Sequence, residues 1–492
     1  MLTYRNYIGG KWVSSDSKEI FKSIDPARPL HILGYFQKST KEDVKTAVEA
    51  AGKAYEPWSD VPAPYRAKVL FNVRDLLIKN KERLSRLLTL EMGKVLPEAR
   101  GDVQEAIDVF EYMAGEGRRL FGHTTPSELR DKFCMTIRRP IGIVGLITPW
   151  NFPIAIPAWK LAPALICGNS VVFKPATDTP LCAIKLVEIL EKAGVPKGAV
   201  NLITGSGAEV GSEIIKNKKI RAISFTGSKK VGEYVMQNAG LKKVGLELGG
   251  KNAIIVMDDA NLDLAVDGII WGGFGTTGQR CTAASRVIVH SKIKKKLEIA
   301  LLKKIKGLRL GHGLKSTTDV GPLINKSAVE KTQKYTVIGK EEGAKLLCGG
   351  KIVKMLGNFY TPTLFTNVTP TMRIAKEEIF GPVVSILEAK NIDQAIEFAN
   401  SVDYGLSSSI YTNDIRNAFK AMEKIEAGLT YVNSSTIGSE VHLPFGGVKD
   451  TGNGTREAGW GGIEEFSEEK TLYVDYSNKL QKAQIDVVKF KK

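Results

Sequence analysis

The strongest constraint on the fold is a regular alternation of short apolar runs with longer helical segments. The runs are Ile141–Thr148, Ser170–Lys174, Ala199–Thr204, Arg221–Thr226 and Val244–Leu248, and the first helical segments between them are Ile154–Cys167 and Pro180–Ala193. Apolar strands connected by helices form a parallel sheet with right-handed crossovers. The chain is therefore predicted to be an α/β protein that binds ligands at the carboxyl ends of its strands.

A second block of the same kind follows Gly250. Its expected elements are the strands Asn252–Val256, Val287–Val289, Val383–Leu387 and Ser409–Tyr411 and helices such as Ile392–Ser401. Ahead of the first block, apolar residues recur at helical spacing from Thr40 to Val109, and Thr40 suits an N-cap. The last predicted strand, Thr471–Tyr476, has no partner nearby in the sequence, so another strand must cover it, in this subunit or a neighbouring one.

Composition and charge narrow the classes of partner. The 492 residues include 70 Lys and Arg against 53 Asp and Glu, a net charge of +17 that favours anionic partners. The basic clusters are short and no nucleic-acid module is recognisable, so nucleic acid is not an expected partner. No apolar run approaches the roughly 18–20 residues that span a bilayer, so no membrane association is expected.

Cysteine and histidine usage predicts a reduced chain without a metal site. The 5 Cys make no CxxC pair, and the 5 His are scattered without an HExxH motif. Unpaired thiols are typical of a reducing compartment. The start of the chain lacks the apolar core of a signal peptide, and we therefore expect a cytoplasmic protein.

Two glycine-rich segments are candidates for phosphate binding. Gly227–Gly232 follows a predicted strand and opens a helix, a context that presents backbone N–H groups to a phosphate. Gly205, Gly207 and Gly211 are spaced one residue too far apart for a GxGxxG motif. A third segment, Gly245–Lys251, resembles a P-loop, but a strand follows it where a P-loop requires a helix, which excludes ATP or GTP hydrolysis.

Three side chains are candidates for catalysis, each with a structural alternative. Cys281 ends a glycine-rich segment beside Arg280, which would lower the pKa of the thiol; the alternative is a buried packing cysteine. Glu247 ends an apolar strand, where a salt-bridged structural carboxylate is the alternative. Asn151 follows Pro149 and Trp150; it is either an N-cap or a donor to a developing oxyanion.

Taken together, these segments identify the chain as similar to the aldehyde dehydrogenase superfamily. The matching segments, in family order, are Thr148–Pro153, Lys174–Ala176, Phe225–Ser228, Leu246–Lys251, Gly278–Cys281, Glu377–Pro382 and Pro444–Gly447. The resemblance implies two Rossmann-like parallel-sheet domains and a small bridging β-sheet, assembled into a homodimer or homotetramer. It places the nucleotide-binding domain at 1–117 and 139–249, the catalytic domain at 250–464 and the bridging segments at 118–138 and 465–492.

The resemblance also implies the roles of the three candidates. Cys281 is the nucleophile that forms a thiohemiacetal and then a thioester. The Asn151 amide and the Cys281 backbone N–H stabilise the oxyanion. Glu247 is the general base that activates water, which favours an acid-forming reaction over acyl transfer to coenzyme A.

A nicotinamide dinucleotide is the implied cofactor. The matching positions are Thr148, Pro149, Trp150, Lys174, Ala176, Thr177, Gly207, Gly211, Phe225, Thr226, Gly227, Ser228, Leu248, Gly249, Glu378 and Phe380. Thr177 stands where NAD-selective relatives often carry a glutamate that repels a 2′-phosphate. With Lys174 nearby, we expect NADP to be preferred, and the alternative is that both NADP and NAD bind.

The substrate is the least constrained feature. By family position, the pocket residues are Phe152, Ile156, Trp159, Arg280, Thr282, Ser439 and Phe445. A guanidinium beside the nucleophile can clamp a distal carboxylate, which predicts a semialdehyde of the α-ketoglutarate or aminoadipate type. In the alternative, Arg280 pairs internally, for example with Glu440, and the enzyme has broad scope or acts on glyceraldehyde or its phosphate. A non-catalytic structural relative is the remaining possibility.

Overall fold

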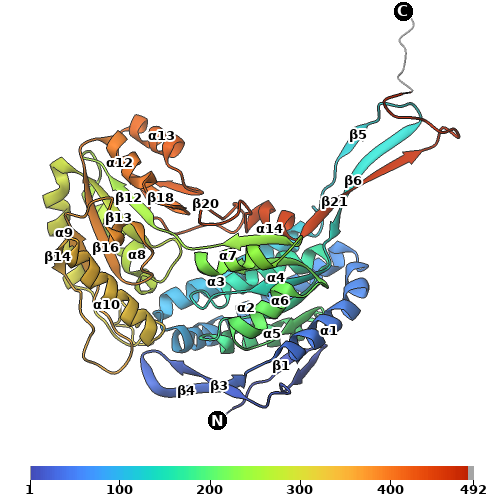
Figure 1. Cartoon of the computed structure of the whole chain (residues 1–492), viewed down its shortest axis with the longest axis horizontal. Helices are drawn as coiled ribbons and strands as arrows, with labels where there is room; N and C mark the ends of the chain where they lie inside the picture. The colour runs from blue at the N-terminus through green and yellow to red at the C-terminus, as the bar shows by residue number, and fades with distance from the viewer. Residues whose placement is uncertain (1, 486–492) are drawn as a thin grey trace, which may run out of the picture.

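The computed structural model describes residues 2–485 and shows an α/β architecture with two seven-stranded sheets (Figure 1). The first sheet has the order β11-β10-β7-β8-β9-β1-β2. Its strands are β1 (Asn6–Ile8), β2 (Lys11–Val13), β7 (Ile143–Ile147), β8 (Ser170–Lys174), β9 (Val200–Leu202), β10 (Ile220–Thr226) and β11 (Lys243–Glu247). All pairs from β11 to β9 are parallel, and only β1 and β2 add in antiparallel fashion. The predicted parallel sheet is confirmed.

Successive strand residues point to opposite faces of this sheet, and both faces carry apolar side chains. Helices therefore cover both faces. Ile143, Ile147 and Val172 pack in one apolar cluster with α1, while Val144 and Phe173 pack in another with α2 to α5. The helical elements are α1 (Lys41–Ser59), α2 (Ala63–Met92), α3 (Leu96–Glu116), α4 (Ala155–Cys167), α5 (Pro180–Ala193), the π-helical η1 (Gly207–Gly211), α6 (Ser212–Lys216) and α7 (Lys229–Asn238).

Local sequence signals set the helix ends. Thr40 is the N-cap of α1, as predicted, and its backbone N–H donates to the Asp43 carboxylate at 2.8 Å. Gly168 and Gly194 end α4 and α5 in the left-handed conformation that glycine adopts without steric cost.

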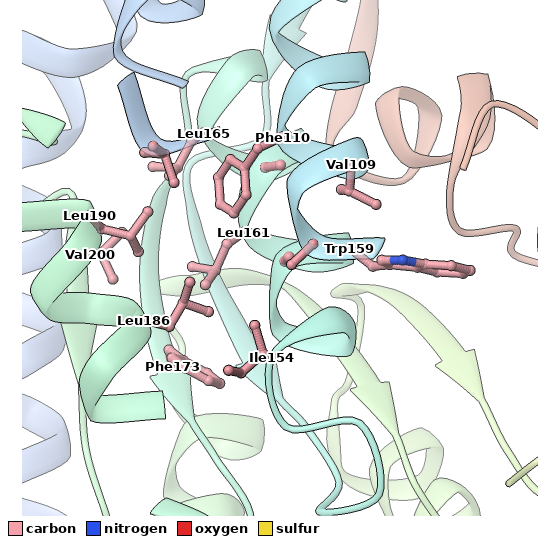
Figure 2. Close-up of a cluster of buried hydrophobic side chains, with 14 of the residues drawn as sticks. Val109, Phe110, Ile154, Trp159, Leu161, Leu165, Phe173, Leu186, Leu190 and Val200 are labelled. Carbon is pink, nitrogen blue, oxygen red and sulfur yellow. The ribbon is translucent and has the colours of Figure 1, made fainter. Parts of the chain in front are cut away.

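A dense apolar core fixes α4 against the sheet (Figure 2). Its labelled side chains come from α3, the N-cap and body of α4, β8, α5 and β9, and are Val109, Phe110, Ile154, Trp159, Leu161, Leu165, Phe173, Leu186, Leu190 and Val200. Because interiors of this kind pack at nearly crystalline density, the amino end of α4 is held rigidly relative to β7 and β8.

The second sheet has the order β14-β15-β16-β13-β12-β18-β19 and is parallel except for β14. Its strands are β12 (Asn252–Val256), β13 (Ala284–His290), β14 (Lys345–Cys348), β15 (Thr363–Thr366), β16 (Val383–Ala389), β18 (Ser407–Tyr411) and β19 (Leu429–Val432). Its helices are α8 (Leu262–Phe274), the 3₁₀ segments η2 (Gly275–Gly278) and η3 (Ser291–Ile293), α9 (Lys294–Lys306), α10 (Lys326–Glu341), α11 (Arg373–Lys376), α12 (Ile392–Asn400) and α13 (Ile415–Lys424). β13 is longer than the predicted Val287–Val289 because its polar ends also pair with β12 and β16.

A three-stranded arm extends away from the body of the molecule (Figure 1). It consists of β5 (Thr124–Pro126), β6 (Lys132–Pro140) and β21 (Ser467–Asp475), and β21 pairs with β6 along its whole length. The predicted final strand therefore finds its partner in a segment more than 300 positions earlier, as the 329 positions between Arg138 and Ser467 show. The last part of the predicted bridging segment, 486–492, lies outside the described residues.

The remaining elements lie outside the two large sheets, their helices and the arm. They are β3 (Ile20–Asp25), β4 (Arg28–Gln37), β17 (Tyr404–Gly405), β20 (Val448–Lys449) and α14 (Gly459–Glu465). Among the described residues, no helix combines the length and apolarity needed to cross a membrane.

Candidate active site

The carboxyl ends of β7, β8, β10 and β11 meet at one edge of the first sheet. Ile147 pairs with both Lys174 and Phe225, and Thr226 pairs with Glu247. The loops that follow these strands therefore lie side by side, and the turn before Cys281 approaches them from the second sheet. This is the ligand-binding edge that the strand pattern predicts.

Two cavities meet at Cys281. The glycine cavity, of about 290 Å³, is lined by Pro149, Trp150, Asn151, Ile156, Thr226, Gly227, Ser228, Leu248, Gly249, Cys281, Ile324, Asn325, Ser327, Ala328, Lys331, Glu378, Ile379 and Phe380. The aromatic cavity, of about 130 Å³, is lined by Glu105, Phe152, Ile156, Trp159, Thr226, Glu247, Leu248, Arg280, Cys281, Thr282, Ile437, Gly438, Ser439, Phe445 and Glu457. All seven predicted pocket residues thus line the second cavity, and Cys281 is accessible from both.

A strained turn presents Cys281. Thr276, Thr277 and Gly278 all have left-handed backbones, with φ of 51°, 58° and 70°. The Glu98 carboxylate holds the turn by accepting from the Thr276 N–H at 2.8 Å. A Cβ on Gly278 would lie 2.3 Å from the Gly381 carbonyl oxygen, so only glycine fits there. Left-handed threonines are uncommon and cluster at functional sites, where surrounding contacts enforce them.

The surroundings of Cys281 keep its thiol protonated. Burial and the carboxylates of Glu247 and Glu378 raise the pKa of Cys281 to about 12. The expectation that Arg280 lowers this pKa is wrong, because the Arg280 guanidinium is turned toward Thr276 and the Phe152 ring. Formation of the thiolate therefore requires a nearby base. The packing alternative does not describe the site either, since the thiol lines two cavities.

Asn151 is buried and directed at the turn that carries the cysteine. Its side-chain N–H donates to the Gln279 carbonyl at 3.1 Å. The N-cap alternative is wrong: Ile154 occupies the N-cap of α4, and the Ala155 N–H donates to Asp102. Because an amide carries two N–H donors, Asn151 has one left for a ligand among the contacts that the described residues make.

Glu247 is a buried carboxyl group without a partner. Neither of its oxygens has a hydrogen-bond partner among the described residues, so the salt-bridge alternative is wrong. Lys160 instead donates to Glu457 and to Ser224. Burial, followed by the neighbouring Glu457, raises the pKa of Glu247 well above its ordinary value. A carboxylate of raised pKa next to the thiol is a suitable general base.

The glycine cavity fits a planar ring joined to a sugar. Trp150 and Phe380 meet edge to face, with ring centroids 5.5 Å apart, and Phe380 has a left-handed φ of 61°. Glu378 accepts from the Gly250 N–H at 3.0 Å, and a Cβ on Gly249 would lie 2.6 Å from its carboxylate. The absence of a side chain at Gly249 thus leaves the Glu378 carboxylate accessible to a hydroxylated ligand.

Other predicted cofactor residues lie outside both cavities. They are Thr148, Lys174, Ala176, Thr177, Gly207, Gly211 and Phe225. The Lys174 amine is buried and donates to the Pro175 carbonyl, and burial lowers its pKa to about 8. The Thr177 hydroxyl donates to the Gly205 carbonyl at 3.2 Å, and Thr177 lines a separate cavity beside β3. Phe225 packs in the core beneath Gly227, where a Cβ would lie 2.4 Å from its ring.

Arg280 lines the aromatic cavity but also has internal partners. Its Nε donates to the Thr276 hydroxyl at 2.8 Å, and its guanidinium lies 3.8 Å from the Glu98 carboxylate. The predicted alternative partner, Glu440, instead lies 3.6 Å from His442. On the opposite wall, Trp159 and Phe445 form an edge-to-face pair with centroids 4.9 Å apart.

Several lining residues were missed by the sequence reasoning. α10 contributes Ser327, Ala328 and Lys331 to the glycine cavity, and α3 contributes Glu105 to the aromatic cavity. The signal for α3 is present in the sequence: Glu98, Asp102 and Glu105 stand four and three positions apart and so share one helix face. An acidic row on a helix face that also carries buried apolar residues indicates a buried polar site.

Comparisons with known proteins agree with this geometry. The model described as "Aldehyde dehydrogenase family" matches residues 12–472. The alpha-ketoglutaric semialdehyde dehydrogenase of Bacillus subtilis is 42% identical over 478 residues, which cover 96% of this chain and 98% of that protein. The succinate-semialdehyde dehydrogenase [NADP(+)] of Escherichia coli is 38% identical over 469 residues, 95% and 97% of the two chains. The crystal structure of betaine aldehyde dehydrogenase from Staphylococcus aureus in complex with NAD+ has a TM-score of 0.95 at 38% identity, covering 97% and 96%.

Proposed function

Because the chain belongs to the aldehyde dehydrogenase family, we propose that it oxidises a short semialdehyde with a distal carboxylate to the corresponding dicarboxylic acid. Aldehyde oxidation with a nicotinamide dinucleotide is the activity of the family. The observation that carries the proposal is the position of Cys281, which joins a cavity suited to the cofactor to one suited to the substrate.

Covalent addition is the first step. The high pKa of the Cys281 thiol requires a base, and Glu247 lines the same cavity. Once Glu247 has taken the proton, the sulfur forms a bond to the aldehyde carbon and the carbonyl π electrons move to the oxygen. The free N–H of Asn151 and the backbone N–H of Cys281 donate to this oxyanion.

Trp150, Gly249, Glu378 and Phe380 are the residues that would hold the nicotinamide half of the cofactor. When bound, it would supply the hydride acceptor that the oxidation requires, and Cys281 would hold the oxidised substrate as an acyl thioester.

Hydrolysis completes the reaction. Glu247 first releases the thiol proton to solvent. As a carboxylate it then accepts a proton from water, and the water oxygen bonds to the thioester carbon. The carbon–sulfur bond then breaks, the electron pair returns to the Cys281 sulfur and the acid leaves. The acid-forming outcome rests on the presence of Glu247 in the cavity.

The carboxylate specificity rests on Arg280 and on the relatives. Among the described residues that line the aromatic cavity, Arg280 alone carries a permanent positive charge. Relatives that cover nearly the whole chain are named for the semialdehydes of α-ketoglutarate, glutarate and succinate, all of which carry a carboxylate.

A substrate panel tests the proposal. Each semialdehyde is paired with a neutral aldehyde of equal length, such as glutarate semialdehyde with pentanal, and reduced cofactor is followed by absorbance. We expect kcat/KM to favour the carboxylate at least tenfold, or about 1.4 kcal/mol. Equal values would make Arg280 a structural residue. Activity in the Cys281→Ala variant equal to that of the parent would overturn the mechanism.

For the cofactor, we propose that NADP is used at least as well as NAD. Thr177 contributes no carboxylate that would repel a 2′-phosphate, and the net charge of +17 favours the more anionic cofactor. The E. coli relative is named for NADP(+), whereas the S. aureus structure contains NAD+. Parallel kcat/KM measurements with the two cofactors decide between preference and dual use.

We further propose a homodimer or homotetramer in the cytoplasm. The arm exposes Tyr473, Val474 and Tyr476, and β21 is an edge strand of its sheet. The five cysteines are all free, which suits a reducing compartment. Within the subunit we propose a nucleotide-binding domain of 1–117 and 139–249, a catalytic domain of 250–464 and assembly segments at 118–138 and 465–492.

A further inference from the structure

Glu105 is a carboxyl group in the aromatic cavity that makes no contact explaining its presence. It lies on α3 and lines the cavity together with Cys281 and Arg280. Within residues 2–485, no hydrogen bond or ion pair engages its carboxyl group, whereas polar groups in protein interiors are nearly always paired. A partner from a ligand would satisfy it.

The other two acids on this face of α3 already have structural roles. Glu98 holds the strained turn through the Thr276 N–H at 2.8 Å. Asp102 accepts from the buried Lys94 amine at 2.9 Å and from the Ala155 N–H at 2.8 Å, which anchors the start of α4. Only Glu105, the third acid of the row, has no structural partner in the described part of the chain.

Arg280 shares the cavity wall with Glu105 and is held in a fixed orientation. Its Nε is occupied by the Thr276 hydroxyl, and its guanidinium packs over the rings of Phe152 and Trp271 at 5.3 and 4.8 Å. A guanidinium has five N–H donors, and these contacts leave several of them for a ligand. The Glu98 carboxylate at 3.8 Å offsets part of its charge, so a second donor would strengthen anion binding.

We propose that protonated Glu105 is the second arm of a carboxylate clamp and donates its O–H to the substrate carboxylate that Arg280 also binds. This inference rests on the proposed function and specifies how the distal group is recognised. A neutral carboxyl group has one O–H donor, and O–H···O⁻ bonds are short and strong. Both side chains and Cys281 line the same cavity of about 130 Å³, so one substrate can contact all three.

Burial is the main cause that favours the protonated form of Glu105. On its own helix, Asp102 and Asp108 add to the effect of burial and raise its pKa, whereas Lys94 and Arg280 lower it; the result is about 8. Glu247 and Glu457 line the same cavity and add no positive charge. A bound substrate carboxylate disfavours ionisation of Glu105 further.

The clamp predicts a specific pH dependence. Below about pH 8, Glu105 is protonated and donates to the substrate. Above that pH, it ionises and repels the carboxylate, so discrimination should fall by up to tenfold for each further pH unit. The quantity to measure is the ratio of kcat/KM for glutarate semialdehyde to kcat/KM for pentanal, because changes in Cys281 or Glu247 chemistry affect both substrates and cancel.

Two substitutions and one matched control test the clamp between about pH 6 and about pH 10. Glu105→Gln keeps an N–H donor that does not titrate, so its ratio should stay constant with pH. Glu105→Leu removes the donor, and its ratio at pH 7 should fall at least tenfold. Glu111→Gln makes the same chemical change on the same helix at an exposed residue that pairs with Arg74, and it should follow the parent.

The outcomes separate this inference from the proposed function. If the parent does not discriminate at pH 7, the carboxylate substrate itself is wrong. If the parent discriminates but Glu105→Leu keeps both the ratio and its pH dependence, the clamp is wrong. If Glu105→Leu raises the ratio, Glu105 is ionised and the cavity suits a cationic end group instead. Thermal melting of each variant establishes that the compared proteins are folded.

Discussion

At the scale of single residues, the site is built from polar groups that the protein buries without pairing. Glu247 is buried and Glu105 is half-buried in the wall of the aromatic cavity, and neither carboxyl group forms a hydrogen bond within the described residues. Leaving a buried polar group unpaired costs about 1–3 kcal/mol, a cost that a packed core does not normally carry. We infer that the substrate and water supply the hydrogen bonds that these groups lack.

Replacement of Glu247 by glutamine should separate the two halves of the reaction. The amide cannot accept a proton from water, so thioester hydrolysis should slow by roughly 10²–10⁴. Because the parent base is effective only when ionised and its pKa is raised, parent turnover should increase with pH, and the variant should lose this increase. The substitution also removes a negative charge that raises the pKa of Cys281, so at alkaline pH the thiol can ionise without Glu247. Under those conditions, rapid mixing should show a burst of reduced cofactor followed by slow turnover, and a slow steady state without a burst would contradict the assigned role.

Thr177 tests the basis of cofactor choice. In Thr177→Glu, a carboxylate would stand near the expected 2′-phosphate, and at a few ångströms like charges repel by one to several kcal/mol. We expect kcat/KM for NADP to fall at least tenfold while the value for NAD changes much less. The control is Lys192→Glu, which introduces a carboxylate at an exposed position on α5. A closer position, Thr179, is buried and would not tolerate the charge. An equal loss with both cofactors would show that Thr177 does not read the phosphate.

At the scale of elements, the strained turn η2 connects the helices of the first sheet to the segment that carries Cys281. It receives Glu98 from α3, and the Thr277 hydroxyl donates to the Gly321 carbonyl at 3.0 Å. Gly278→Ala would force a Cβ into the Gly381 carbonyl at a φ of 70°, so the turn must shift. We expect a loss of about 1–3 kcal/mol in unfolding free energy and a larger loss of kcat, measured by denaturation and steady-state kinetics.

Gly343 provides the matched control for that substitution. It has a φ of 94°, but a Cβ there would meet no atom within 4 Å. Gly343→Ala should therefore cost about 1–2 kcal/mol of backbone strain and leave kcat unchanged. Equal effects of the two substitutions on kcat would show that the Gly278 turn does not position Cys281.

Elements were predictable from the sequence where their own residues carried the signal. β8, β12 and α5 have the predicted bounds because apolar runs and a Pro at the start of the helix mark their ends. The site geometry was less accessible because its contacts join distant segments: Glu98 and Thr276 are 178 positions apart. The residues next to Arg280 and Glu98 in the sequence do not indicate that these two side chains lie together. For the same reason, the position of Glu105 in the aromatic cavity was not predicted.

At the scale of the whole molecule, the arm has a strand edge and apolar side chains that no other part of the described chain covers. β21 pairs with β6 from Ser467 to Asp475 and presents its other edge and several apolar side chains to solvent. Exposed edge strands with apolar side chains favour pairing with another chain. The arm extends away from the body of the molecule (Figure 1), and no residue of β5, β6 or β21 lines either cavity at Cys281, so assembly and chemistry can be tested separately.

A charged arm should lower the mass of the assembly. Val474 and Tyr476 are 50% and 61% exposed, and replacing both by aspartate places two charges where a second copy would pack. Light scattering of the parent should give two or four times the subunit mass of 53.8 kDa, and the double variant should shift toward the monomer. Leu356→Asp, at an apolar residue that is 60% exposed and lies outside the arm, should keep the parent mass. A parent that is monomeric would contradict the proposed assembly, and a double variant with the parent mass would show that apolar burial of these two side chains does not hold the subunits together.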